Sequence, residues 1–234
     1  MLDWSDKTIR WAPLYFTSIA IFFFSLLARA FSPLASSLLL LFLFGLLSRV
    51  PCMVSDFTKD MEFVDFLTVM IAVSLGGIWG GLFGASILLF SRLFNSGGDG
   101  GYSEHPGYTA MEAFNFLLIG SASGVIYSVF NGDLLYTMYA FTALRYGLTV
   151  LFTLLFAPSY LFYCLQLLAV GAVVAYATNT VSVLLFGDYL VSILRSGPSL
   201  SAWAYGFMFS VLALWSVLRL SLGPERAEAG VQVV

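Results

Sequence analysis

The amino-acid sequence predicts an all-α fold, a polytopic transmembrane helical bundle with about seven or eight membrane segments. Of its 234 residues, 60% are hydrophobic and only 10% are charged, whereas soluble domains carry about 25% charged residues. The apolar residues fall into runs of about 20, the length of helix that crosses a bilayer core. These runs lack the alternation of a membrane β-barrel, and lipid does not accept an open strand edge, so we expect the spans to be helical.

Most of the runs are long enough to cross a membrane once. Six such runs lie at Ala12–Phe31, Pro33–Val50, Thr109–Phe130, Leu134–Phe156, Tyr160–Phe186 and Ala202–Leu222. Ser32-Pro33 leaves almost no connection between the first two runs, which predicts an antiparallel hairpin. Gly187–Ser201 is an amphipathic connection compatible with a short interfacial helix. We expect residues 1–222 to form a single integral membrane domain and residues 223–234 a short polar tail.

The central run, Glu62–Phe94, is too long for one span and barely long enough for two. A single crossing gives seven spans and divides the positive residues almost evenly between the two sides of the membrane. A double crossing, with helices at Phe63–Leu75 and Ile78–Phe94 and a turn at Gly76-Gly77, gives eight.

The distribution of lysine and arginine favours the double crossing, because these residues accumulate on the cytoplasmic side. It leaves Arg29 and Arg195 on one side and Arg145 inside the membrane. The other side then carries Lys7, Arg10, Arg49, Lys59, Arg92, Arg219 and Arg226. We therefore expect a multi-pass protein of the cell membrane, with a short glycine-turn hairpin at 63–94 and both termini cytoplasmic.

Glycines recur at four-residue spacing in and after this hairpin. They are Gly76, Gly77, Gly80, Gly81, Gly84, Gly120 and Gly124. A helix face of nearly bare backbone lets a second helix approach closely, so we expect these residues to pack helices together. The alternative is a glycine-interrupted span that lines a binding site, as in many transporters.

A second candidate site consists of polar residues within the apolar runs. Arg145 lies at the centre of Leu134–Phe156 and needs a partner, because burying a charge in the membrane is costly. We predict that it meets Glu112, supported by Asn115 and Gln166. Such a centre would either bind an anionic or zwitterionic ligand or act as a structural ion pair that fixes helix register.

The remaining polar residues form no pattern typical of catalysis or metal binding. His105 is the one histidine in the chain and lies in a polar loop, so a Ser-His-acid triad is not expected. Cys52 and Cys164 are too few for a metal site. Asp65 and Asp133 lie nearer the ends of their runs and are expected at the membrane interface. We expect a non-enzymatic protein with no cofactor, no metal and no nucleic-acid partner.

Between Asp65 and Tyr127 the sequence passes through a short apolar helix, a glycine turn, a Gly-rich helix, a variable loop and a helix with small residues. These parts are Phe66–Leu75, Gly76-Gly77, Trp79–Ser86, Asn95–Gly107 and Phe116–Tyr127 with Gly120 and Gly124. This order resembles the core of a superfamily that includes the substrate-binding S subunits of energy-coupling-factor transporters and the rod-shape-determining membrane protein D.

The resemblance implies a compact helical bundle with cytoplasmic termini that either captures a small molecule from outside or acts as a scaffold for other membrane proteins. S subunits carry a small-residue motif on their first helix, where the coupling subunit docks, whereas Ala12–Phe31 is rich in Phe and Leu. Three functions therefore remain: a small-molecule-binding or transport subunit, a structural subunit of a membrane complex, and, least favoured by the sequence, an intramembrane enzyme.

Overall fold

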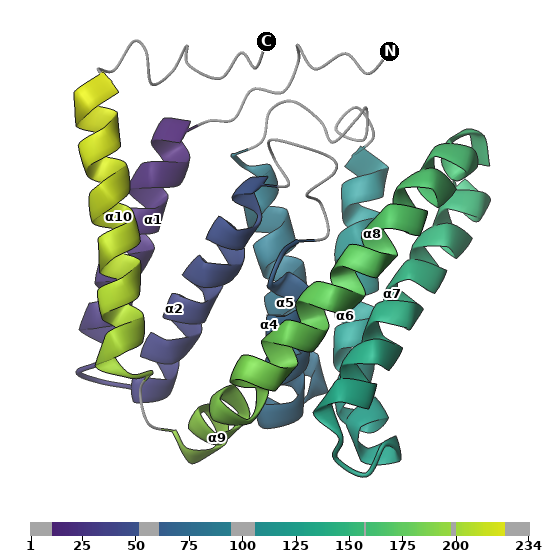
Figure 1. Ribbon diagram of the computed structural model, residues 1–234, viewed down its shortest axis with the longest axis horizontal. Coiled ribbons are helices and arrows are strands. Elements are labelled where there is room, and N and C mark those ends of the chain that lie inside the picture. Colours follow the sequence, from purple (N-terminus) through teal and green to yellow (C-terminus); the bar gives the residue numbers. More distant parts are fainter. Residues whose placement is uncertain (1–10, 52–60, 95–105, 157, 198–199, 223–234) are drawn as a thin grey trace.

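The computed structural model describes residues 11–51, 61–94, 106–156, 158–197 and 200–222, and this part of the chain is helical without a β-strand (Figure 1). Its helices are α1 (Trp11–Ala28), α2 (Pro33–Ser48), α4 (Val64–Leu75), α5 (Gly77–Arg92), α6 (Pro106–Val129), α7 (Leu134–Phe156), η3 (Pro158–Tyr160), α8 (Leu161–Ser182), the π-helix η4 (Val183–Gly187), α9 (Asp188–Ser196) and α10 (Ala202–Leu222). The predicted polar tail, residues 223–234, lies outside the described residues.

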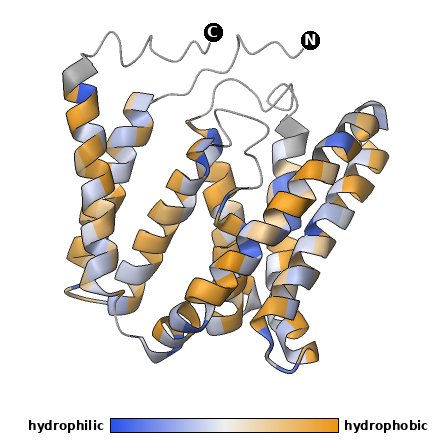
Figure 2. Ribbon diagram, viewed as in Figure 1, coloured by the Kyte–Doolittle hydropathy of each residue, from blue (hydrophilic) through white to orange (hydrophobic). Residues whose placement is uncertain are grey.

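Five of the described helical stretches are long and apolar enough to cross a membrane. They are Trp11–Ala28, Thr109–Val129, Leu134–Phe156, Cys164–Ser196 and Ala202–Leu220. Three shorter apolar helices, α2, α4 and α5, have 16, 12 and 16 residues. Hydrophobic residues cover most of each helix, including surfaces that face outward (Figure 2). The helices and their apolar surfaces indicate that the protein resides in a membrane.

The central run breaks at one residue. α4 ends at Leu75 and α5 begins at Gly77, with Gly76 between them at φ +113° and ψ +145°. Only glycine adopts this backbone conformation without strain, because a Cβ atom would collide with the neighbouring peptide groups. Residues 62–94 therefore form two helices that pack against each other, and not one continuous helix.

The helices at one edge of the molecule, α1 and α10, lie side by side (Figure 1). The Tyr15 and Ser216 hydroxyls are 2.6 Å apart, and the Trp11 and Trp215 rings meet edge to face. A small apolar cluster of Leu14, Leu46 and Phe94 also includes Trp11 and Trp215 at its border. The start of α1 and the ends of α2, α5 and α10 therefore lie at the same end of the bundle.

The helix does not end at Phe186, the last residue of the predicted apolar run, and the predicted short helix within Gly187–Ser201 is α9. The backbone stays helical from α8 through the π-helix Val183–Gly187 and into α9, and it stops only at Gly197, which has φ +74°. One face of α9 is buried, through Leu190, Val191, Ile193 and Leu194. Gly187 lies within the helix, with a φ of −56° and a ψ of −61°. Glycine is favoured at a helix end where the backbone needs a positive φ, and Gly187 does not have one.

Candidate functional site

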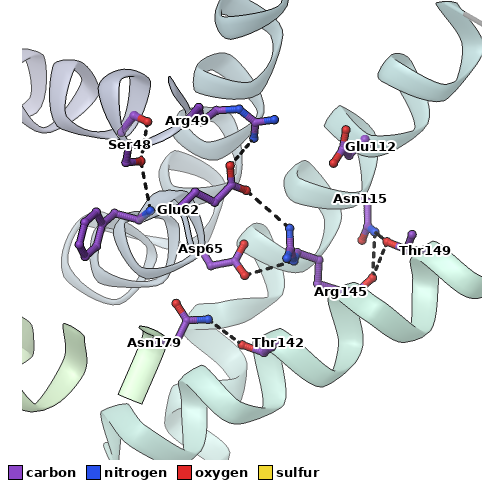
Figure 3. Close-up of polar contacts among 12 residues, drawn as sticks. Ser48, Arg49, Glu62, Asp65, Glu112, Asn115, Thr142, Arg145, Thr149 and Asn179 are labelled. Carbon is purple, nitrogen blue, oxygen red and sulfur yellow. Dashed lines mark hydrogen bonds and ion pairs between the residues drawn. The ribbon is translucent and has the colours of Figure 1, made fainter. Parts of the chain in front are cut away.

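A cluster of buried charges joins α2, α4 and α7 (Figure 3). Arg49 Nη1 lies 2.8 Å from Glu62 Oε2, and Arg145 Nε lies 3.1 Å from Asp65 Oδ2. Arg145 Nη1 is 3.8 Å from the other Glu62 oxygen. Exposed fractions are 7% for Arg145, 5% for Glu62 and 2% for Asp65. Each carboxylate therefore faces a guanidinium within the protein interior, and we call these four residues the charged cluster.

The ends of two short helices supply most of the charged cluster. Arg49 caps the C-terminus of α2, and Asp65 lies in the first turn of α4. A cation at a helix C-terminus and an anion at an N-terminus both interact favourably with the helix dipole. The backbone N–H of Phe63 also donates to the Ser48 hydroxyl, at 3.1 Å. These contacts fix the start of α4 against the end of α2.

A second ion pair links α5 to α6. Arg92 Nη2 donates to Glu112 Oε2 at 3.1 Å, and both side chains are largely buried. Together with the charged cluster, this pair gives three guanidinium groups and three carboxylates. Their charges balance, so the ion pairs are suited to holding five helices in register.

The structure pairs Arg145 differently from the sequence prediction. Its acidic neighbours are Asp65 and Glu62, whereas Glu112 binds Arg92. Asp65, which the sequence places near the end of its apolar run, is buried among the protein's own side chains. Glu62 and Asp65 are three residues apart, a spacing that would place both on one face of a helix, and this signal was available in the sequence.

The two amides predicted to support Arg145 differ in position. Asn115 is buried, and its Nδ2 donates to the Arg145 carbonyl and the Thr149 hydroxyl, both at 3.1 Å. The amide orientation is fixed, because the carbonyl can only accept and Thr149 already donates to the same carbonyl. Gln166, in contrast, is exposed on the surface of α8. Asn115 therefore supports the backbone that carries Arg145, and Gln166 does not join the site.

α7 carries a line of polar contacts on the turns around Arg145. Asn179 on α8 donates to the Thr142 hydroxyl at 3.1 Å, one turn before Arg145. Thr149, one turn after it, accepts from Asn115. Among the described residues, no three His, Cys, Asp or Glu side chains are placed to share a metal ion. The chemistry available here is ion pairing, hydrogen bonding and proton exchange at carboxyl groups.

The predicted packing glycines lie where α4, α5 and α6 approach most closely. A Cβ atom on Gly81 would lie 2.5 Å from the Leu117 carbonyl oxygen, and one on Gly120 would lie 2.6 Å from Gly81 Cα. Added Cβ atoms on three others would also collide with neighbouring atoms: Gly77 with Ser121, Gly80 with Ala72, and Gly84 with Thr68. These five glycines have no room for a side chain.

Two of the predicted glycines differ from the rest, and one was missed. A Cβ on Gly124 would lie 3.6 Å from its nearest neighbour, an ordinary contact. Gly76 is required by its positive φ and not by crowding, since its nearest neighbour would be 3.9 Å away. Gly45 on α2 lies against Ile87, 2.5 Å from the position of an added Cβ. No glycine spacing in the sequence indicated Gly45, because it stands alone in its helix.

An apolar groove separates α2 from α4 and α5. Its volume is about 530 Å³, and its lining is Leu34, Leu38, Phe42, Ile71, Leu75, Trp79, Leu82, Phe83 and Ser86. Trp79 is 60% exposed at this groove. Ligand pockets have volumes of roughly 300–1,000 Å³ and mostly apolar linings. The groove was not predicted from the sequence, because it depends on how α2 docks against the other helices.

The stability of the fold should depend on pH through Glu62, which precedes α4. Burial raises the pKa of the Glu62 carboxyl from 4.5 to about 7, even though Arg49 and Arg145 lower it. Between pH 4.5 and 7 the folded protein therefore binds more protons at Glu62 than the unfolded chain does. The free energy of unfolding should fall by about 3 kcal/mol as the pH rises through this window.

The measurement is the thermal unfolding midpoint in detergent from roughly pH 5 to pH 8, for the wild type and Glu62→Gln. Glutamine does not titrate, so the variant should lose the part of the slope that Glu62 contributes. Equal slopes for the two proteins would contradict the raised pKa.

Comparisons with protein-family models, curated proteins and solved structures find no match for this chain.

Proposed function

We propose that this chain is a non-enzymatic multi-pass protein of the cell membrane that binds a small molecule, acting as a ligand-binding or transport subunit. The observation that carries the proposal is the apolar groove between α2 and the α4–α5 pair. Its volume of about 530 Å³ is that of a small-molecule site. The lining of the groove is almost entirely apolar, so its ligand has an apolar body. The helices that line the groove, α2, α4 and α5, are shorter than a full span, so the ligand enters from the bilayer.

We propose eight crossings, by α1, α2, α4, α5, α6, α7, the α8–α9 stretch and α10, with both termini in the cytoplasm. The cluster of Trp11, Leu14 and Trp215 supports an even number, because it brings the start of α1 and the end of α10 to one end of the bundle. The distribution of lysine and arginine supports the cytoplasmic assignment of that end. In this topology α4 and α5 form the glycine-turn hairpin.

The order of short helix, glycine turn and Gly-rich helix, which resembles S subunits of energy-coupling-factor transporters, also supports a binding subunit. The second candidate is a structural subunit of a membrane complex. It is favoured by the charged cluster and by the Arg92–Glu112 pair, whose balanced charges hold helices in register. In both cases the interior ion pairs are structural.

Chemical extraction of the purified protein distinguishes a small-molecule-binding subunit from a structural subunit. The wild type in detergent should release a small molecule in a stoichiometric amount, identified by mass spectrometry. Ser86→Phe should lose it, because Ser86 lines the groove and a phenyl ring would fill part of it. Ser210→Phe is the control, since Ser210 is exposed on α10, outside the groove.

A wild-type protein that carries stoichiometric protein partners and no small molecule would overturn the binding proposal in favour of the structural subunit. Retention of the molecule by Ser86→Phe would place binding outside the groove.

A further inference from the structure

Arg219, near the end of α10, lies against aromatic rings of α1. Its guanidinium carbon is 5.1 Å from the ring centre of Tyr15 and 5.1 Å from that of Phe16. The Tyr15 hydroxyl is 2.6 Å from the Ser216 hydroxyl of α10, and the Tyr15 ring meets Trp215 edge to face, with 5.3 Å between the ring centres. These contacts hold the guanidinium group on the surface that α1 and α10 share.

The guanidinium group of Arg219 has no acceptor among the described residues, whereas Arg49, Arg92 and Arg145 each face a carboxylate. Arg219 is partly buried, and its Nη1 is buried without a hydrogen-bond partner. The other edge of the group, formed by Nε and Nη2, carries two parallel N–H donors. A cation away from bulk water needs an acceptor to offset its desolvation, so we expect this acceptor to come from outside the described residues.

This cation lies where two apolar spans end on the same side of the bundle. The start of α1 and the end of α10 lie together (Figure 1), and Arg219 is the second-last residue of the apolar stretch Ala202–Leu220. Side chains of a helix tilt toward its N-terminus, so the guanidinium group points back along α10, to the second turn of α1. Phe16 and Leu220 are 62% and 84% exposed, so the surface around the cation is apolar and faces lipid.

We infer that Arg219 binds the phosphate of an anionic phospholipid from the leaflet at this end of the bundle, with the acyl chains against the exposed apolar surface of α1 and α10. Arginine binds phosphate oxygens through paired N–H donors. No described carboxylate balances the cation, so a lipid with a net negative charge is favoured over a zwitterionic one. The groove is lined by α2, α4 and α5, so this site is separate from it and does not depend on the proposed function.

Native mass spectrometry of the full chain tests the inference. The protein in detergent is mixed with equal amounts of phosphatidylglycerol and phosphatidylcholine that carry the same acyl chains. The first bound lipid should be phosphatidylglycerol by about threefold, the scale of one exposed ion pair. Arg219→Gln should bring the ratio close to one. Arg29→Gln is the matched control and should keep the wild-type ratio, because Arg29 is exposed and lies over the Tyr205 ring, at the opposite end of α10.

A wild type that binds the two lipids equally would overturn the inference, and so would a preference that Arg219→Gln retains. An equal loss of preference in Arg29→Gln and Arg219→Gln would show that lipid binding follows the net charge of the protein and not this site. A second measurement separates lipid from free phosphate. Phosphatidylglycerol should raise the thermal unfolding midpoint of the wild type more than that of Arg219→Gln, and a rise with inorganic phosphate alone, at constant ionic strength, would overturn the assignment to a lipid.

Discussion

Arg145→Met should destabilise the protein by about 3–5 kcal/mol, the largest loss expected from a single substitution in this chain. The arginine faces Asp65 at 3.1 Å and Glu62 at 3.8 Å, and all three side chains are buried. Methionine fills a similar volume but leaves the Asp65 carboxylate without the cation that offsets its desolvation. The measurement is the thermal unfolding midpoint in detergent, followed by size-exclusion chromatography.

A double-mutant cycle with Asp65→Asn separates loss of the ion pair from general damage to packing. Asp65→Asn removes the buried negative charge, so adding Arg145→Met to it should cost less than Arg145→Met costs in the wild type. The coupling energy should be about 1–3 kcal/mol. If the two substitutions were simply additive, Arg145 would not depend on Asp65, and the ion pair would not explain its burial.

Arg219→Met is the matched control. Arg219 lies in the last turn of α10, over the rings of Tyr15 and Phe16. It has no ion pair among the contacts of the described residues, so its loss should cost well under half as much. A comparable loss at both sites would show that the two arginines stabilise the protein through their aliphatic stems and not through a buried carboxylate.

The helical class and the break at Gly76 could be predicted from the sequence, because apolar run length and glycine backbone freedom are local properties. The partner of Arg145 could not. A carboxylate near the end of an apolar run can face either the membrane interface or a neighbouring helix, and the run itself does not distinguish the two. α4 has just 12 residues and packs against its neighbours, so its first turn, with Asp65, is interior.

For candidate residues on other helices too, the sequence does not show which neighbouring helix each side chain faces. Gln166 was predicted in the polar centre because it interrupts an apolar run, but one polar residue does not reveal which face of its helix turns inward. Gly120 and Gly124 share a spacing in the sequence, yet only Gly120 is crowded. How far two helices stay in contact depends on their crossing angle, and the sequence of one helix does not determine it.

Gly120→Ala should destabilise the protein by about 1–3 kcal/mol, whereas Gly124→Ala, one helical turn away, should not. The new Cβ at position 120 would lie 2.6 Å from Gly81 Cα and 2.8 Å from Gly81 N, so the atoms it meets are backbone and cannot turn aside. α6 would have to move away from α5. At position 124 the nearest atom is 3.6 Å away, and alanine is the better helix former by up to about 1 kcal/mol.

Unfolding midpoints of the two variants in the same detergent measure the difference. Gly147→Ala on α7 provides a third reference, because an added Cβ there meets no atom within 4 Å. A ranking in which Gly120→Ala is clearly least stable means that the glycines act through backbone contact between α5 and α6. Equal midpoints for all three variants would mean that the helices separate at little cost, and the close approach would not be what holds α5 to α6.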